Sequence, residues 1–200
     1  MTALPIARTG MPLSCRRTLL LALAALTLMA GAAPAAAEHP ATFMQRVANE
    51  LVIAARTKDP AVLAAAIRRH ADIPSLGLAS LGSYAARMPA ADRPTYYNGM
   101  VKFMANYAAK EAPKYPVARA IVMSATEETA SGVNVDSRIE LRDGSSYDVR
   151  WLVVRRGSGW KVRDAQVLGF WMSPFMQRLF ENYISENGGN PQALILALSR

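Results

Sequence analysis

Apolar side chains recur with a helical period in the first part of the chain that follows residue 37. Residues 43–57 place their apolar side chains on one face, and residues 61–70 repeat the pattern behind an Asp59-Pro60 start. Aspartate caps a first helical turn and proline fits its first position. Ile73-Pro74 breaks this run. We therefore predict two amphipathic helices, followed by a short helix that ends near Leu81.

The longest predicted helix lies between Asp92 and Pro113. Asp92 can cap it, Pro94 lies in the first turn, where a missing N–H costs nothing, and Pro113 ends it. Its large apolar side chains form two neighbouring stripes: Tyr96, Met100, Phe103 and Tyr107, then Tyr97, Val101, Met104 and Ala108. So wide a face fits a buried core helix, and it also fits the wall of an adaptable apolar cavity. Spacing alone does not separate the two.

From residue 117 onward the period changes to that of a strand. Residues 133–142 alternate apolar and polar side chains, and Asp143-Gly144 is a hairpin turn signal. Residues 146–156 return with four large side chains on one side: Tyr147, Val149, Trp151 and Val153. A glycine-rich turn leads to a strand over 160–168, and residues 117–126 form the first strand. Four sequential strands joined by short turns predict an antiparallel meander.

Helical patterns return over residues 173–186 and 191–198. The apolar face of the sheet must be covered, and only the helices can cover it. The predicted class is α+β: a four-stranded antiparallel curved sheet covered by N-terminal and C-terminal helices around an apolar pocket. No repeat or linker interrupts residues 38–200, which we expect to form one domain.

Residues 1–37 have the pattern of a cleaved signal peptide. Arg8, Arg16 and Arg17 form a basic start without acids, and an apolar run over 18–30 leads to Ala35-Ala36-Ala37 before Glu38. The run is shorter than the roughly 20 apolar residues that a membrane span needs. We therefore expect the remaining residues to be exported.

Without the leader, the composition is that of a moderately basic chain without cysteine. Residues 38–200 carry 20 basic and 15 acidic side chains, a formal charge of +5, and Cys15 lies in the leader. Thiol and disulfide chemistry are thereby excluded from the exported part. The charge is compatible with anionic lipid headgroups, and also with an ordinary exported protein. Because the basic residues are scattered, no nucleic-acid partner is expected.

Patterns of catalytic and metal-binding residues are missing from the same residues. His39 lies at the expected new N-terminus, and His70 ends a basic helical turn, where we expect it to be solvated. Glu127 and Glu128 are adjacent on a strand and point to opposite faces. Asp164 is the one candidate for a buried acid, although pairing with an arginine at the sheet edge is the favoured interpretation. We expect no metal, no cofactor and no enzymatic activity.

An ordered series of short motifs resembles the MlaC/toluene-tolerance family of periplasmic phospholipid-binding proteins. The resemblance covers about residues 43–198. Its most specific part is the strand over 159–164, Gly-Trp-Lys-Val-Arg-Asp, followed by a helix that contains Gln177-Arg178. The other parts are Leu81-Gly82-Ser83-Tyr84, the helix from Tyr96 to Tyr107, Gly169-Phe170-Trp171-Met172, Gly188-Gly189 and Leu194-Ile195.

The resemblance implies a periplasmic, monomeric carrier that binds a diacyl phospholipid by its acyl chains. Such carriers shuttle lipid between an outer-membrane lipoprotein complex and an inner-membrane ABC transporter complex, and so serve outer-membrane lipid asymmetry. A branch of the family is associated with hopanoids, and the resemblance extends to it.

Eight apolar residues are expected to contact lipid, although each is also a plausible core residue. They are Tyr84, Met100, Phe103, Tyr107, Trp151, Val153, Phe170 and Trp171. Two alternatives stay open. One is a small cone-fold enzyme acting on an apolar substrate, with Asp164 as its acid. The other is a non-catalytic adaptor that docks through its aromatic surface in the cell envelope.

Overall fold

Residues 38–200 are described in the computed structural model of the chain. The predicted signal peptide, residues 1–37, lies outside the described residues. None of the helices in the described part is both long and apolar enough to cross a membrane.

Local capping signals set the first two helices. Helix α2 (Pro40–Thr57) begins behind His39, whose Nδ1 accepts a hydrogen bond from the backbone N–H of Ala41 at 3.3 Å. It ends at Lys58, which has a left-handed backbone with φ 57°. Helix α3 (Pro60–His70) is capped by Asp59, whose Oδ1 accepts from the N–H of Ala61 at 2.8 Å. The Asp-Pro signal therefore acts as the sequence predicts.

The next two helices are found where the sequence predicts them, but the predicted cap of the second is not formed. Helix α4 (Ile73–Leu81) leads through a 3₁₀ turn, η1 (Gly82–Arg87), to the long helix α5 (Arg93–Glu111). Asp92 precedes α5, but its carboxylate accepts a hydrogen bond from the Gln192 side chain and does not cap the helix. A second 3₁₀ turn, η2 (Ala112–Lys114), contains Pro113 and ends the run.

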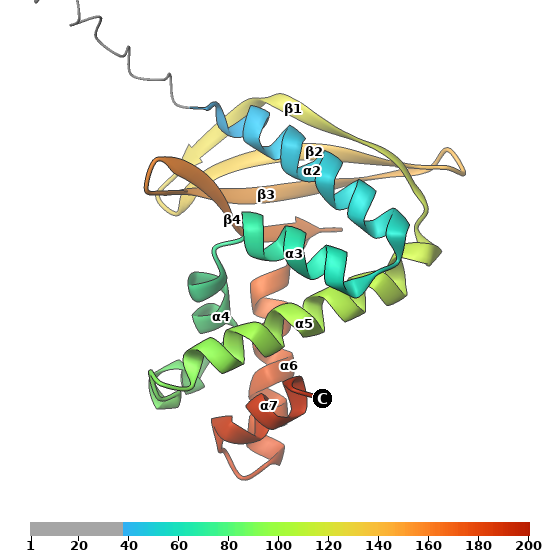
Figure 1. The fold of residues 1–200 in the computed structure, drawn as a ribbon. Coiled ribbons are helices and arrows are strands. Elements are labelled where there is room, and N and C mark those ends of the chain that lie inside the picture. Colours follow the sequence, from blue (N-terminus) through green and yellow to red (C-terminus); the bar gives the residue numbers. More distant parts are fainter. Residues whose placement is uncertain (1–37) are drawn as a thin grey trace, which may run out of the picture. The chain divides into compact units, whose positions relative to one another are not determined.

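The sheet is an antiparallel meander with the order β1-β2-β3-β4-β5 (Figure 1). Its strands are β1 (Val117–Thr129), β2 (Gly132–Leu141), β3 (Ser146–Arg156), β4 (Gly159–Val167) and β5 (Phe170–Trp171). The α+β class is thereby confirmed, with five strands in place of four. Two residues are too few to show alternation, so the sequence pattern does not reveal β5. Register shifts within β1 and between β3 and β4 bend the sheet.

Helix α2 packs against one face of this sheet (Figure 1). At one end of that face, Val133, Val135 and Val153 are buried against the first turns of α2. The α2 side chains in this cluster are Phe43, Met44 and Val47. The period-two alternation of β2 and β3 therefore points apolar side chains at the helix, as predicted.

Helices α4 and α5, together with α6 (Met172–Glu186) and α7 (Pro191–Leu198), bury a second cluster. Tyr96 lies at its centre, with its hydroxyl donating to the carbonyl oxygen of Gly77 at 3.1 Å. Burial raises the pKa of Tyr96. The Phe180 ring meets Tyr96 and Phe103 edge-on, with ring centroids 6.3 and 5.7 Å apart. These aromatic contacts connect α6 to α5.

Truncation of Phe180 tests this connection. Phe180 is 2% exposed, whereas Phe175 on the same helix is 46% exposed. We expect Phe180→Ala to lower the free energy of unfolding by about 3–5 kcal/mol, because it leaves a cavity between α5 and α6. Phe175→Ala should change it by only about 0.5 kcal/mol. Urea unfolding followed by circular dichroism measures both, and equal losses would contradict the described packing.

Candidate functional site

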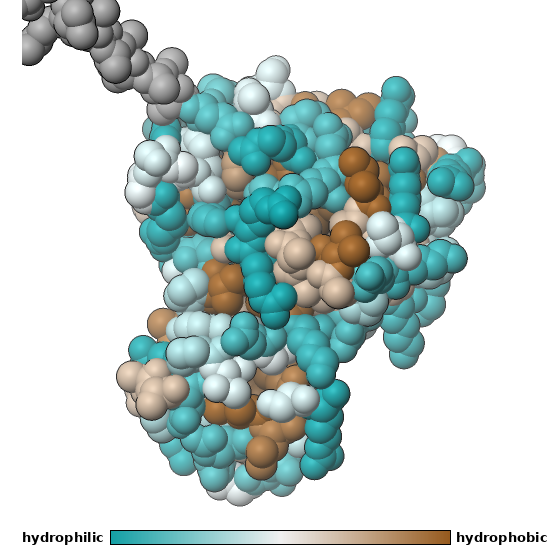
Figure 2. Space-filling view, in the orientation of Figure 1, coloured by the Kyte–Doolittle hydropathy of each residue, from teal (hydrophilic) through white to brown (hydrophobic). Residues whose placement is uncertain are grey.

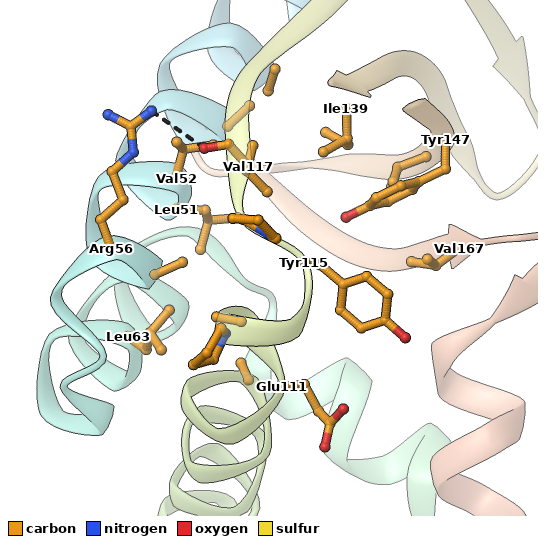
Figure 3. A pocket seen from close by; sticks show the side chains of 18 of the residues that line it. Leu51, Val52, Arg56, Leu63, Glu111, Tyr115, Val117, Ile139, Tyr147 and Val167 are labelled. Carbon is orange, nitrogen blue, oxygen red and sulfur yellow. Dashed lines mark hydrogen bonds between the residues drawn. The ribbon is translucent and has the colours of Figure 1, made fainter. Parts of the chain in front are cut away.

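An apolar cavity of about 730 Å³ opens between the sheet, the second half of α2 and the end of α5 (Figure 3). Its apolar walls come from helices, strands and the segment before β1. They include Leu51, Val52, Leu63, Ala108, Val117, Ile139, Val149 and Val167. The size is that of pockets that enclose most of a bound ligand.

Strand register explains why one end of the sheet lines the cavity. Ala120, Ile139 and Tyr147 are cross-strand partners on β1, β2 and β3, and Val149 is paired with Val167 on β4. Successive residues of a strand alternate between faces, so these residues share the face on which α2 packs. The cavity is therefore the continuation of the sheet's apolar face beyond the cluster under the first turns of α2.

Trp151 lies between the packed end of this face and the cavity. Its Nε1–H donates to Ser137 Oγ at 2.8 Å, and the Ser137 hydroxyl donates to the carbonyl oxygen of Val149 at 3.3 Å. Ser137 is 1% exposed, so its polar atoms need these partners. The bond satisfies the indole N–H within the sheet and leaves the Trp151 ring as an apolar part of the lining.

Three tyrosines contribute phenol groups to the lining. Tyr107 and Tyr115 are 56% and 53% exposed, whereas Tyr147 is half-buried. Burial raises the pKa of Tyr147, and the nearby Tyr115 adds a smaller effect in the same direction. Each phenol hydroxyl can donate a hydrogen bond to a ligand.

The charged side chains of the lining are few. Arg56 donates to the carbonyl oxygens of Val117 and Ala118 at 3.5 and 2.7 Å. Figure 3 shows its guanidinium at the start of β1 and Glu111 at the end of α5. Glu111 forms an ion pair with Lys114 at 2.9 Å. Lys58 and Arg142 are exposed and complete the charged set.

The lining of this cavity favours an apolar guest. Because the space is open to solvent, it holds either water or a ligand. Water gains little from walls that are mostly hydrocarbon.

The structure divides the eight predicted lipid-contact residues among several sites. Tyr107 and Trp151 line the cavity. Met100 is buried in the cluster around Tyr96, and Tyr84 and Phe103 pack against that cluster. The other three lie elsewhere on the sheet: Val153 buried under α2, and Phe170 and Trp171 on β5. A lipid contact for any of the eight stays a prediction.

The cavity also contains residues that were not predicted, and patterns in the sequence point to several. Tyr147 and Val149 share with Trp151 the apolar side of β3, which the alternation identifies. Leu51 lies on the apolar face of the first predicted helix. Tyr115 lies in an irregular segment between two prolines, which shows no periodicity.

The prediction that His70 is solvated is wrong. It is 5% exposed, and its Nε2 lies 2.7 Å from Glu50 Oε2. Arg69 pairs with the other oxygen of the same carboxylate at 2.5 Å. The hydrogen bond to His70, followed by the charges of His70 and Arg69, lowers the pKa of Glu50. This group connects α3 to α2, and within residues 38–200 no three His, Cys, Asp or Glu side chains gather as metal ligands.

Asp164 does not pair with an arginine either. Its Oδ1 accepts hydrogen bonds from the backbone N–H groups of Ala165 at 2.8 Å and Ser173 at 3.0 Å. Ser173 lies in the first turn of α6, which has no capping side chain at the preceding Trp171. Asp164 therefore caps α6 from the neighbouring strand. It does not line the cavity.

The fold and the cavity define an α+β protein with one curved antiparallel sheet, whose apolar face is closed at one end by a helix and hollow at the other. The family model described as "MlaC protein" matches residues 43–200. The chain belongs to the MlaC family, as the ordered motifs in its sequence indicate.

Among solved structures, the chain is similar to the phospholipid-binding protein from Ralstonia solanacearum, whose structure was determined in complex with a phospholipid. The two share 16% sequence identity with a TM-score of 0.62, over 81% of this chain and 96% of the other. This likeness shows the fold. A comparison with curated proteins gives no match.

Removal of the Asp164 charge tests the described burial of this carboxyl. Burial raises the pKa of Asp164 above its ordinary 3.8. Between the two values the unfolded chain has lost the proton and the folded chain retains it, so this carboxyl lowers stability as pH rises. Asp164→Asn keeps the Oδ1 acceptor and cannot ionise. We expect it to gain stability relative to the parent protein as pH rises above 3.8, measured by urea unfolding.

Asp143→Asn is the matched control. Its hydrogen bonds with Ser145 lower the pKa of Asp143. The sign is therefore opposite, and this variant should lose stability relative to the parent protein as pH rises. An Asp164→Asn difference that is constant with pH would contradict the described burial of the carboxyl.

Proposed function

We propose that this protein binds the acyl chains of a phospholipid in the cavity between α2, α5 and the sheet, and acts as a lipid carrier. The observation that carries the proposal is a cavity of about 730 Å³ with hydrocarbon walls. Two comparisons support it: the chain belongs to the MlaC family, and a protein of the same fold was solved with a phospholipid.

Apolar burial supplies enough free energy for such binding. Each methylene group removed from water contributes about 0.8 kcal/mol, so an enclosed chain of ordinary length gains on the order of 10 kcal/mol, offset by the ordering of the chain. No directional bond is needed. A carrier of this kind can release its lipid to a partner protein whose apolar site buries the same acyl chains from water.

The chemistry of the lining favours binding over catalysis. The lining has no histidine, and its one carboxylate, Glu111, is paired with Lys114. A general acid or base needs a proton-transfer group beside the substrate. Asp164, the residue on which the enzyme alternative depends, lies outside the lining and caps a helix.

We further propose a periplasmic location and a shuttle role. The basic, apolar and Ala-Ala-Ala segments of residues 1–37 support export. Family membership supports exchange of lipid with an inner-membrane ABC transporter complex and an outer-membrane lipoprotein complex. The protein itself acts as a monomer in this proposal, with a diacyl phospholipid as its ligand.

Filling the cavity tests the proposal. Ala108 lines the cavity on α5, and Lys110 is exposed two residues further along the same helix. We expect protein purified after expression of the full chain to carry a phospholipid, detected by native mass spectrometry and by solvent extraction. Ala108→Trp should reduce the bound fraction at least about tenfold, because the indole takes the volume of the chains. Lys110→Trp should retain the lipid.

Circular dichroism must show that both variants fold. A folded parent protein that carries no lipid and takes none from vesicles would refute the carrier. If such a protein instead binds an envelope protein tightly, the adaptor alternative is favoured.

A further inference from the structure

Basic side chains outnumber acids in the lining of the cavity. Arg56, Lys58 and Arg142 belong to it, against Glu111 alone. The apolar walls include buried side chains such as Ile139 and Val149, whereas these basic residues are exposed. A lipid whose chains follow the sheet would leave its headgroup among them.

The acids close to these cations in the sequence are already engaged. Glu111 pairs with Lys114 at 2.9 Å, and Asp59 caps α3 through the N–H of Ala61. Asp143 accepts from the backbone N–H and the hydroxyl of Ser145 at 2.9 and 2.7 Å. None of the three carboxylates forms an ion pair with Lys58 or Arg142. Asp59 and Asp143 keep their charge, since they bond to neutral groups, and they weaken the positive field without forming an ion pair with the Lys58 or Arg142 side chain.

Local backbone conformation and hydrogen bonds fix the positions of the residues that carry these cations. Lys58 ends α2 in the left-handed conformation, φ 57°, a position that favours glycine. The N–H of Arg142 donates to the carbonyl oxygen of Pro116 at 2.9 Å, which holds the β2–β3 turn against the segment before β1. Arg56 is bound to the carbonyl oxygens of Val117 and Ala118 on the same segment. Arg56 and Arg142 are thus anchored at residues 116–118, and Lys58 follows Arg56 by two residues at the end of α2.

We propose that Lys58 and Arg142, with Arg56 beside them, form a headgroup subsite that selects phospholipids of net negative charge over zwitterionic ones. This inference rests on the proposed lipid binding. The cations attract the phosphate of any phospholipid, but they also repel a quaternary ammonium group attached to it. The phenol hydroxyls of Tyr107 and Tyr115 are neutral and do not discriminate by charge.

The selectivity is modest, because the groups are exposed. Surface ion pairs are weakened by water and salt, and each changes an equilibrium by a factor of only about two to three. Two unpaired cations therefore predict about a three- to tenfold preference, which declines at high ionic strength.

Competition between two lipids tests the subsite. The purified protein is incubated with vesicles that contain equal amounts of phosphatidylglycerol and phosphatidylcholine with identical acyl chains, and is then re-isolated. The bound lipids are measured by mass spectrometry. We expect phosphatidylglycerol to be enriched about three- to tenfold. The double variant Lys58→Gln/Arg142→Gln should bind the two lipids at near parity.

A matched variant separates the effect of the cations in the cavity lining from the effect of the protein's net charge. Arg163 and Arg178 are exposed and outside the cavity, and Arg163→Gln/Arg178→Gln removes the same net charge. It should keep the enrichment. Parity in the parent protein, or an equal loss of selectivity in both double variants, would overturn the subsite and leave lipid binding intact. A parent protein that retains neither lipid would instead refute the proposed function itself.

Discussion

Large side chains of α2 fill one end of the sheet's apolar face, whereas Ala48 and Val52 pack at the other end, and the rest of the site depends on this difference in packing. The first turns of α2 fill the space over Val133, Val135 and Val153. Its later turns carry Leu51 and Val52, which line the cavity together with Ile139 and Val149. One helix and one sheet face therefore form both a packed core and a hollow, without any change in their sequence pattern.

Helix α5 likewise combines a packed part and a cavity wall along its length. Its wide apolar face is compatible with a core helix and with a cavity wall. The structure uses it for both: Tyr96 and Met100 are buried in the cluster with Phe180, whereas Tyr107 and Ala108 reach the cavity. The cluster around Tyr96 is a fixed support, because its aromatic rings and the Tyr96–Gly77 hydrogen bond hold α4, α5 and α6 together. The wall at the far end of α5 is thereby held in position.

Periodicity and caps were sufficient to predict the α+β class and the extents of the main elements. The return strand over 146–156 and the helix over 191–198 are found with those bounds. The site was harder to predict, because the period shows which face of an element is apolar and not what covers it. Met100 and Tyr107 lie on one stripe of one helix, yet only Tyr107 lines the cavity. Side-chain contacts between distant segments could not be predicted from periodicity either. Asp164 caps α6, and His70 on α3 bonds to Glu50 on α2.

The hydrogen bonds of the polar groups on the sheet face affect how the cavity can bind a ligand. Ser137 and Trp151 bond to each other, so neither requires a partner from a ligand. Among residues 38–200, the one buried side-chain polar atom without a partner is Nε of Arg93, which lies outside the lining. Apart from the tyrosine hydroxyls and the charged residues of the rim, a ligand in the cavity therefore meets hydrocarbon and the Ser137–Trp151 pair. Binding then depends on apolar area and hardly on the position of any ligand atom, which suits chains of variable length and unsaturation. In the proposed carrier, discrimination by charge is left to the exposed rim, where water keeps every interaction weak enough for release.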